Sequence, residues 1–126
     1  MKYTLLSLGL LALCLGFCLF SMQTVTVACE RTSDALQASL SAVQKQALSQ
    51  AEDALSEAET LWQEKAAFFG IVLRHEQIDE IVTGFAELHQ YAQIGDLDDY
   101  QATCARLLTA LGHLADMEKP TLENIL

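Results

Sequence analysis

The residues that could support metal or acid–base chemistry lie around the first histidine of the chain. His75 and Glu76 begin like the His-Glu-x-x-His helix of zinc proteases, but Asp79 stands where that motif requires its second histidine. A zinc site usually takes at least three protein ligands, and the sequence near His75 offers no second His or Cys. The protease motif is therefore excluded. We interpret His75 as a structural residue at a helix start, held by Asp79 and a neighbouring helix.

The two other histidines, His89 and His113, lie beside apolar residues. A histidine in such a place is more often a partly buried, hydrogen-bonded residue than a ligand. A folded pocket that joins all three histidines is the alternative, and it would make the chain an anchored or secreted bundle that binds a small ligand or a metal. We predict neither metal nor cofactor, and we treat the histidines as structural.

The cysteines and the clustered aspartates lack a catalytic pattern as well. Cys14 and Cys18 fall in the apolar N-terminal run, while Cys29 and Cys104 are expected to stay two separate thiols, with Cys104 packed in the core. The three aspartates between positions 96 and 99 lack the glycine and distal glutamate of a calcium-binding loop, so helix capping explains them better. No phosphate-cradling loop, Ser-His-Asp set or dinucleotide motif is present in the sequence, so we predict that the protein is not an enzyme.

The N-terminal segment gives the clearest signal in the sequence. Residues 3–29 contain no charged side chain. As a helix, the apolar run is roughly 35 to 40 Å long, enough to cross a hydrocarbon core of about 30 Å. We predict an uncleaved membrane anchor at residues 1–29 that contacts the bilayer through residues 3–28. A cleaved signal peptide and a lipoprotein signal that modifies Cys29 are the alternatives.

The charges around this segment predict its orientation and exclude some partners. Lys2 precedes the apolar run, while Glu30, Arg31 and Asp34 follow it. The positive-inside rule then places the N-terminus in the cytoplasm and the following domain, residues 30–126, on the outer side of the cell membrane. That domain carries 17 acidic and six basic residues. Such an excess of negative charge argues against nucleic acid and anionic lipid headgroups as partners.

The domain after the anchor shows helical periodicity throughout, with apolar residues spaced by three and four. A first helix is predicted to start at Thr32 or Ser33 as its cap. A second apolar stretch runs from residue 48 to 72, and the region 45–51 allows either a bend between two helices or one long helix. Short connections favour antiparallel neighbours, so we predict an all-α fold: a transmembrane helix followed by a small antiparallel bundle of three or four helices.

Two further helices are predicted in the C-terminal half. One starts near His75 and ends at Gly95, and the other is capped by Asp96 and ends at Lys119-Pro120. The apolar tail at residues 121–126 is expected to dock on the bundle. The apolar face of the first of these helices is predicted to contain Ile78, Ile81, Val82, Phe85, Leu88, Ala92 and Ile94. The aromatic core is predicted to contain Trp62, Phe68, Phe69, Phe85, Tyr91 and Tyr100.

A set of spaced residues along the chain matches a known pattern. The most specific parts are the His-x-x-Ile-Asp element at residues 75–79 and the Leu-x-Asn-Ile ending at residues 122–125. Over nearly its whole length the chain resembles a bacterial family known as domain of unknown function 4363. The chain departs from the expected pattern in two places: Arg74 stands where an acidic residue is expected, and Gln46-Ala47-Leu48 stands where a turn sequence is expected. The matched residues, which we treat as structural, are Trp62, His75, Ile78, Asp79, Tyr91, His113, Asn124 and Ile125.

The resemblance implies one N-terminal hydrophobic segment, a helical body and no known activity. It also suggests another membrane protein as a partner. Together with the composition, it predicts a noncatalytic single-pass membrane protein whose outer helical domain is an interaction or accessory module.

Overall fold

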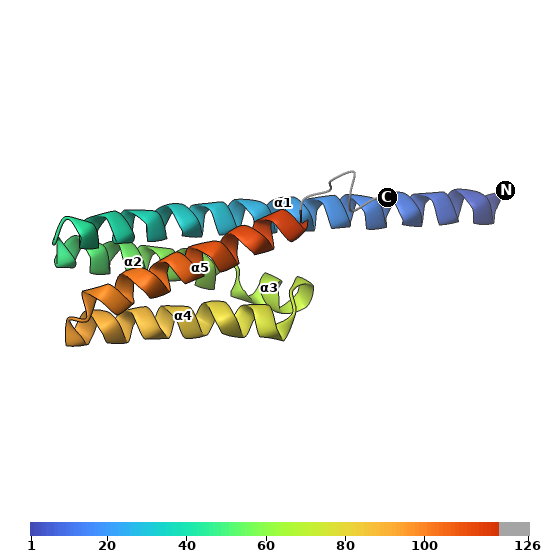
Figure 1. Cartoon of the computed structure of the whole chain (residues 1–126). Helices are drawn as coiled ribbons and strands as arrows, with labels where there is room; N and C mark the ends of the chain where they lie inside the picture. Colours follow the sequence, from blue (N-terminus) through green and yellow to red (C-terminus); the bar gives the residue numbers. More distant parts are fainter. Residues whose placement is uncertain (119–126) are drawn as a thin grey trace.

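A computed structural model describes residues 1–118 of the chain, and within this range the chain forms five α-helices and no strand. They are α1 (Lys2–Gln44), α2 (Leu48–Glu64), α3 (Ala66–Val72), α4 (His75–Ile94) and α5 (Leu97–Glu118). Helix α1 packs between α2 and α5, and α4 lies on the other side of the bundle against α5 and α2 (Figure 1). Neighbouring long helices run antiparallel. The predicted all-α class and the antiparallel bundle are therefore confirmed.

Helix α1 is unbroken, so its N-terminal half projects from the bundle in line with the packed half (Figure 1). The prediction that a separate helix starts at Thr32 or Ser33 is wrong. Thr32 lies inside α1 with none of its surface exposed, and its hydroxyl has no hydrogen-bond partner within residues 1–118. No glycine or proline occurs between residues 17 and 69, so nothing in the local sequence stops the helix. The predicted domain boundary between residues 29 and 30 falls inside α1 and stays a prediction.

The turn between α1 and α2 shows that the region 45–51 contains a break. Gln46 adopts a left-handed conformation with φ of 62°. The Gln46 N–H donates to the Val43 carbonyl, and the Ala47 N–H donates to the Ala42 carbonyl at 2.8 Å. These two bonds form a Schellman motif, which satisfies carbonyls at the end of a helix. Glycine is the usual residue at this left-handed position, so glutamine there gave no turn signal in the sequence.

The turn between α4 and α5 follows the sequence prediction. Gly95 ends α4 with φ of 75°, and the Asp96 N–H donates to the Tyr91 carbonyl. The Asp96 carboxylate then accepts a hydrogen bond from the Asp99 N–H at 3.1 Å, which caps the first turn of α5. The predicted end of α5 at Lys119-Pro120 and the docking of the tail lie outside the described residues.

Helix α3 is a short separate element after a break at Lys65. In one continuous helix, residues seven apart are about 10 Å apart along the axis. The break instead brings the Trp62 ring of α2 and the Phe69 ring of α3 together, with centroids 4.4 Å apart. Phe69 is fully buried and Trp62 is 2% exposed, so the predicted burial of Trp62 is confirmed.

The core lies along the axis of the bundle, and α4 contributes a narrower stripe than predicted. Its buried apolar side chains are Ile81, Phe85, Leu88 and Ala92, whereas Val82 and Ile94 are 52% and 65% exposed. Val82 lies about 100° around the helix from Ile81, outside the face that meets α2 and α5. The prediction was therefore wrong for these two residues. Gly84 allows the close approach of α4 and α5, since a Cβ atom there would lie 2.8 Å from Leu107.

Candidate functional site

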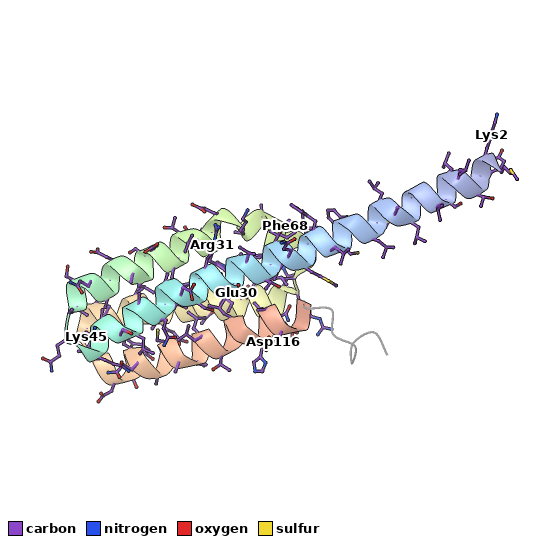
Figure 2. The ribbon with its side chains drawn as sticks, turned by 90° about the horizontal axis from the view of Figure 1, so that it is seen from above. Lys2, Glu30, Arg31, Lys45, Phe68 and Asp116 are labelled. Carbon is purple, nitrogen blue, oxygen red and sulfur yellow. The ribbon has the colours of Figure 1, made fainter. Side chains whose placement is uncertain are left out.

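The first candidate surface is an exposed apolar segment, residues 3–20 of α1. Its large apolar side chains from Tyr3 to Phe20 are between 56% and 87% exposed, and they project all round the helix (Figure 2). Within the described residues, α1 is the one helix that is long and apolar enough to cross a membrane. A signal sequence near an N-terminus meets the same criterion. An apolar surface of this size on an isolated helix needs lipid or protein to cover it.

The exposed segment joins the bundle without a linker. Packing starts immediately after Phe20: Ser21 is 8% exposed, Val25 is fully buried and Ala28 is 6% exposed. Because these side chains are covered by other helices, the apolar surface that is continuous around α1 ends at Phe20. Bilayer contact over residues 3–28 stays a prediction; the stretch in which every residue is exposed is residues 3–20, and beyond it exposed and buried positions alternate.

A cavity of about 310 Å³ lies beside this junction, between α1 and the C-terminal end of α2. Phe20, Val27 and Leu61 contribute apolar surface to it. Arg31 and Lys65 contribute positive charge and Glu64 contributes negative charge. This arrangement could not be predicted, because Arg31 and Lys65 are far apart in the sequence and no local motif connects them. The cavity shows that Lys65 and the start of α3 lie at the same end of the bundle as the exposed segment.

The histidines occupy different environments. His89 Nε2 lies 3.0 Å from Glu59 Oε2, which connects α4 to α2 through a partly exposed pair. Such a pair contributes at most about 1 kcal/mol. His113 is exposed and lines a cavity of about 410 Å³ between α4 and α5, together with Gln77, Glu80 and Arg106. Among residues 1–118, no three or more His, Cys, Asp or Glu side chains lie in a group that could hold a metal ion.

The remaining motif residues are divided between surface and core. His75 and Asp79 are both exposed at the start of α4, and within the described range no hydrogen bond or ion pair joins them. Ile78 and Tyr91 are half-buried against the core. The structure therefore gives no support for His75 being held by Asp79. Asn124 and Ile125 lie outside the described residues.

Cys104 is a buried thiol on α5 and forms no disulfide. Its Sγ donates to the Leu36 carbonyl at 3.5 Å, and burial raises the pKa of the thiol to about 11. A thiol with so high a pKa is a poor nucleophile at neutral pH. The predicted role of Cys104 in core packing is confirmed. Cys29 is also buried, whereas Cys14 and Cys18 are exposed on the projecting segment.

A buried hydrogen-bond chain connects three helices at the centre of the bundle. Ser39 Oγ of α1 donates to the Ala51 carbonyl of α2 at 2.8 Å and lies 2.5 Å from the Tyr100 hydroxyl of α5. A carbonyl can only accept, so the single hydroxyl proton of Ser39 goes to Ala51 and Tyr100 donates to Ser39. Burial is the largest cause of the raised pKa of Tyr100. No sequence signal connected these residues, since Ser39 and Tyr100 are 61 positions apart.

Removing the Ser39 hydroxyl is expected to destabilise the bundle more than removing the Tyr100 hydroxyl. Ser39→Ala leaves both the Tyr100 hydroxyl and the Ala51 carbonyl without this partner in the core, at a cost of about 1–3 kcal/mol. Tyr100→Phe keeps the bond to Ala51 and costs about 0.5–1.5 kcal/mol. Urea unfolding of the full chain in a mild detergent, followed by circular dichroism, measures both values.

The control for this pair is Ser56→Ala on the exposed face of α2, which should change stability by less than about 0.5 kcal/mol. The double variant should cost less than the sum of the two single variants, because it also removes the stranded phenol. If the cost of the double variant equalled the sum of the two single costs, the hydrogen bonds of Ser39 and Tyr100 would not be coupled.

The fold and the exposed segment define a class of protein: an up-and-down helical bundle whose first helix continues outward as an uncovered apolar segment. The chain belongs to the family described as a domain of unknown function, DUF4363, whose family model matches residues 19–125. The resemblance seen in the sequence is thus confirmed. The comparisons with curated proteins and with solved structures found no match. The matched region starts within two residues of Ser21, where the packing of α1 starts.

Proposed function

We propose that this chain is a single-pass membrane protein in which the exposed segment of α1 anchors a noncatalytic helical bundle beside the membrane. The observation that carries the proposal is the abrupt change along α1, where every side chain through Phe20 is exposed and packing starts at Ser21. Residues 3–20 form about 27 Å of helix, close to the hydrocarbon thickness of about 30 Å. The segment therefore has the length and the uniform exposure that a membrane anchor requires.

The proposed orientation has Lys2 on the cytoplasmic side and the acidic bundle on the outer side of the cell membrane. Lys2 is the one charged side chain before Glu30, and it lies at the far end of the projecting helix (Figure 2). A basic residue on the short cytoplasmic side agrees with the positive-inside rule. In this orientation the 17 acidic residues of the chain all remain outside the membrane.

The bundle is proposed to be an interaction or accessory module for another membrane protein. Three pairs of polar side chains join its helices: Ser39 with Tyr100, Glu59 with His89 and Glu87 with Arg106. These contacts support a structural role for the hydroxyl, carboxylate, imidazole and guanidinium groups of the three pairs. The continuous α1 also holds the bundle at a fixed height above the membrane, which suits a contact with a neighbouring protein in the same membrane.

The anchor is tested by fractionating cells that express the chain with a C-terminal tag. We expect a full-length band in membranes that resists salt and alkaline washes. Introducing Leu11→Arg together with Leu13→Arg should cost about 5–7 kcal/mol of insertion free energy, at about 2.5–3.5 kcal/mol for each arginine near the helix centre. The membrane band should therefore be lost.

The matched control is Val82→Arg together with Ile94→Arg, which places two arginines at exposed apolar positions of α4. This variant should fractionate like the wild type. A shortened soluble band from the wild-type chain would show cleavage of the segment and would overturn the proposed anchor.

The proposed partner is tested by crosslinking in native membranes and identifying what copurifies. We expect the wild-type chain and the α4 control to recover the same membrane protein, and the anchor variant to lose it. Recovery that does not depend on the anchor would contradict a partner held in the same membrane.

A further inference from the structure

Helix α3 presents apolar side chains to the outside at one end of the bundle. Ile71 is 78% exposed, Ala66, Ala67 and Gly70 are exposed, and Phe68 is half-buried. Phe69 is fully buried on the other side of the helix, where it contacts Trp62. Single exposed apolar residues such as Val82 and Ile94 are ordinary, but Ile71 lies among exposed Ala66, Ala67 and Gly70 in a stretch without charge. A grouped apolar surface of this kind indicates a further contact.

This end of the bundle is also the end from which the apolar segment of α1 emerges. Leu61 and Lys65, just before α3, line the same cavity as Phe20 and Val27 of α1. Figure 1 shows α3 at the end of the bundle from which α1 projects, and Figure 2 places Phe68 at that end and Lys45 at the opposite end. If the exposed segment crosses a bilayer, α3 faces the surface of that bilayer.

The charges that flank α3 suit a phospholipid surface. The stretch 66–73 contains no charged side chain and is bounded by Lys65 and Arg74, both of which are exposed. Long basic side chains can keep their apolar stems at a membrane surface while their charged ends reach phosphate groups. The nearest acidic residues along the chain, Glu64 and Glu76, lie outside this basic pair. The stretch 66–73 itself carries no negative charge, although Glu64 lines the same cavity as Lys65 and Asp116 lies at the same end of the bundle (Figure 2).

We infer that α3 is a second membrane contact of this chain, with Ile71 inserted among phospholipid headgroups and Lys65 and Arg74 against their phosphates. The inference rests on the proposed anchor, since the unbroken α1 is what brings α3 to the bilayer surface. The proposed partner is a bilayer of zwitterionic phospholipid, because the excess negative charge of the whole bundle opposes binding to a strongly anionic surface. The spanning segment of α1 and the interfacial contact of α3 would together fix the tilt of the bundle relative to the membrane.

The test uses tryptophan as a probe of lipid contact in the full-length chain. Three variants carry a single tryptophan in a Trp62→Phe background: Ile71→Trp on α3, Ile94→Trp at the far end of α4, and Leu13→Trp in the anchor. Each is reconstituted in vesicles of phosphatidylcholine with brominated acyl chains, which quench tryptophan that enters the bilayer. Interfacial insertion reaches about 5–10 Å into the membrane, so quenching at position 71 should exceed that at position 94 by at least about twofold.

The controls separate a failure of the inference from a failure of the anchor. Quenching at position 13 with equal, weak quenching at positions 71 and 94 would overturn the contact of α3 and leave the anchor in place. Absence of quenching at position 13 would overturn the anchor, and the inference with it. If the Trp62→Phe background does not fold, the same three substitutions are made with Trp62 retained, and the wild-type quenching is subtracted.

Discussion

Replacing Trp62 by alanine is expected to lower the free energy of unfolding by about 3–5 kcal/mol, the usual cost of truncating a large aromatic side chain in a packed core. Trp62 is 2% exposed, and it packs on the fully buried Phe69. The substitution would open a cavity at the joint between α2 and α3. Because Phe69 is the buried residue of α3, that helix would also lose its main attachment to the bundle.

Urea unfolding of the full chain in a mild detergent measures this effect. Thr60→Ala is the matched control, since Thr60 is exposed on the same helix and its substitution should cost less than about 0.5 kcal/mol. A cost below about 1 kcal/mol for Trp62→Ala would contradict a well-packed site and would indicate that the surrounding helices close the cavity.

Placing proline at position 26 is expected to cost about 3 kcal/mol or more, because α1 is continuous through that position. Proline removes the hydrogen bond from residue 26 to the Met22 carbonyl and clashes with that carbonyl. It also disfavours the helical conformation of the preceding residue, Val25, which is fully buried. The packing of Ser21 and Val25 on the bundle would therefore be disturbed.

The control for this substitution is Thr26→Ala, which keeps the backbone hydrogen bond and should be close to the wild type. Unfolding measurements in the same detergent compare the two variants. If proline cost no more than alanine, the chain would have to break between the apolar segment and the bundle. Such a break would also remove the argument that α1 holds the bundle close to the membrane.

The end of α4 and the start of α5 could be predicted because their causes are local. Gly95 is the residue best suited to a left-handed conformation, and Asp96 carries the oxygen that caps the next helix. Both effects depend on a few consecutive residues. The family resemblance could be recognised for a related reason, since it rests on short runs and fixed spacings in the sequence.

The separate helix start at Thr32 or Ser33 was predicted wrongly and the first turn was left open, because contacts between helices decided both. Thr32 is a good helix cap, yet it is equally compatible with a buried position inside a helix, and the packing of α2 and α5 against α1 decided between the two. Gln46 is a poor residue for a left-handed turn, and it adopts that conformation because two hydrogen bonds and the packing of α2 on α1 hold it there.

The sequence alone was enough to predict a helical chain and an uncharged, largely apolar segment at residues 3–29. Both properties follow from composition and from periodicities of a few residues. Only the tertiary structure decided where the uncovered segment ends, which face of α4 is buried, and that Ser39 contacts Tyr100. These features depend on which helix faces meet, and residues far apart in the sequence, such as Phe20 and Lys65, come together only when the bundle forms.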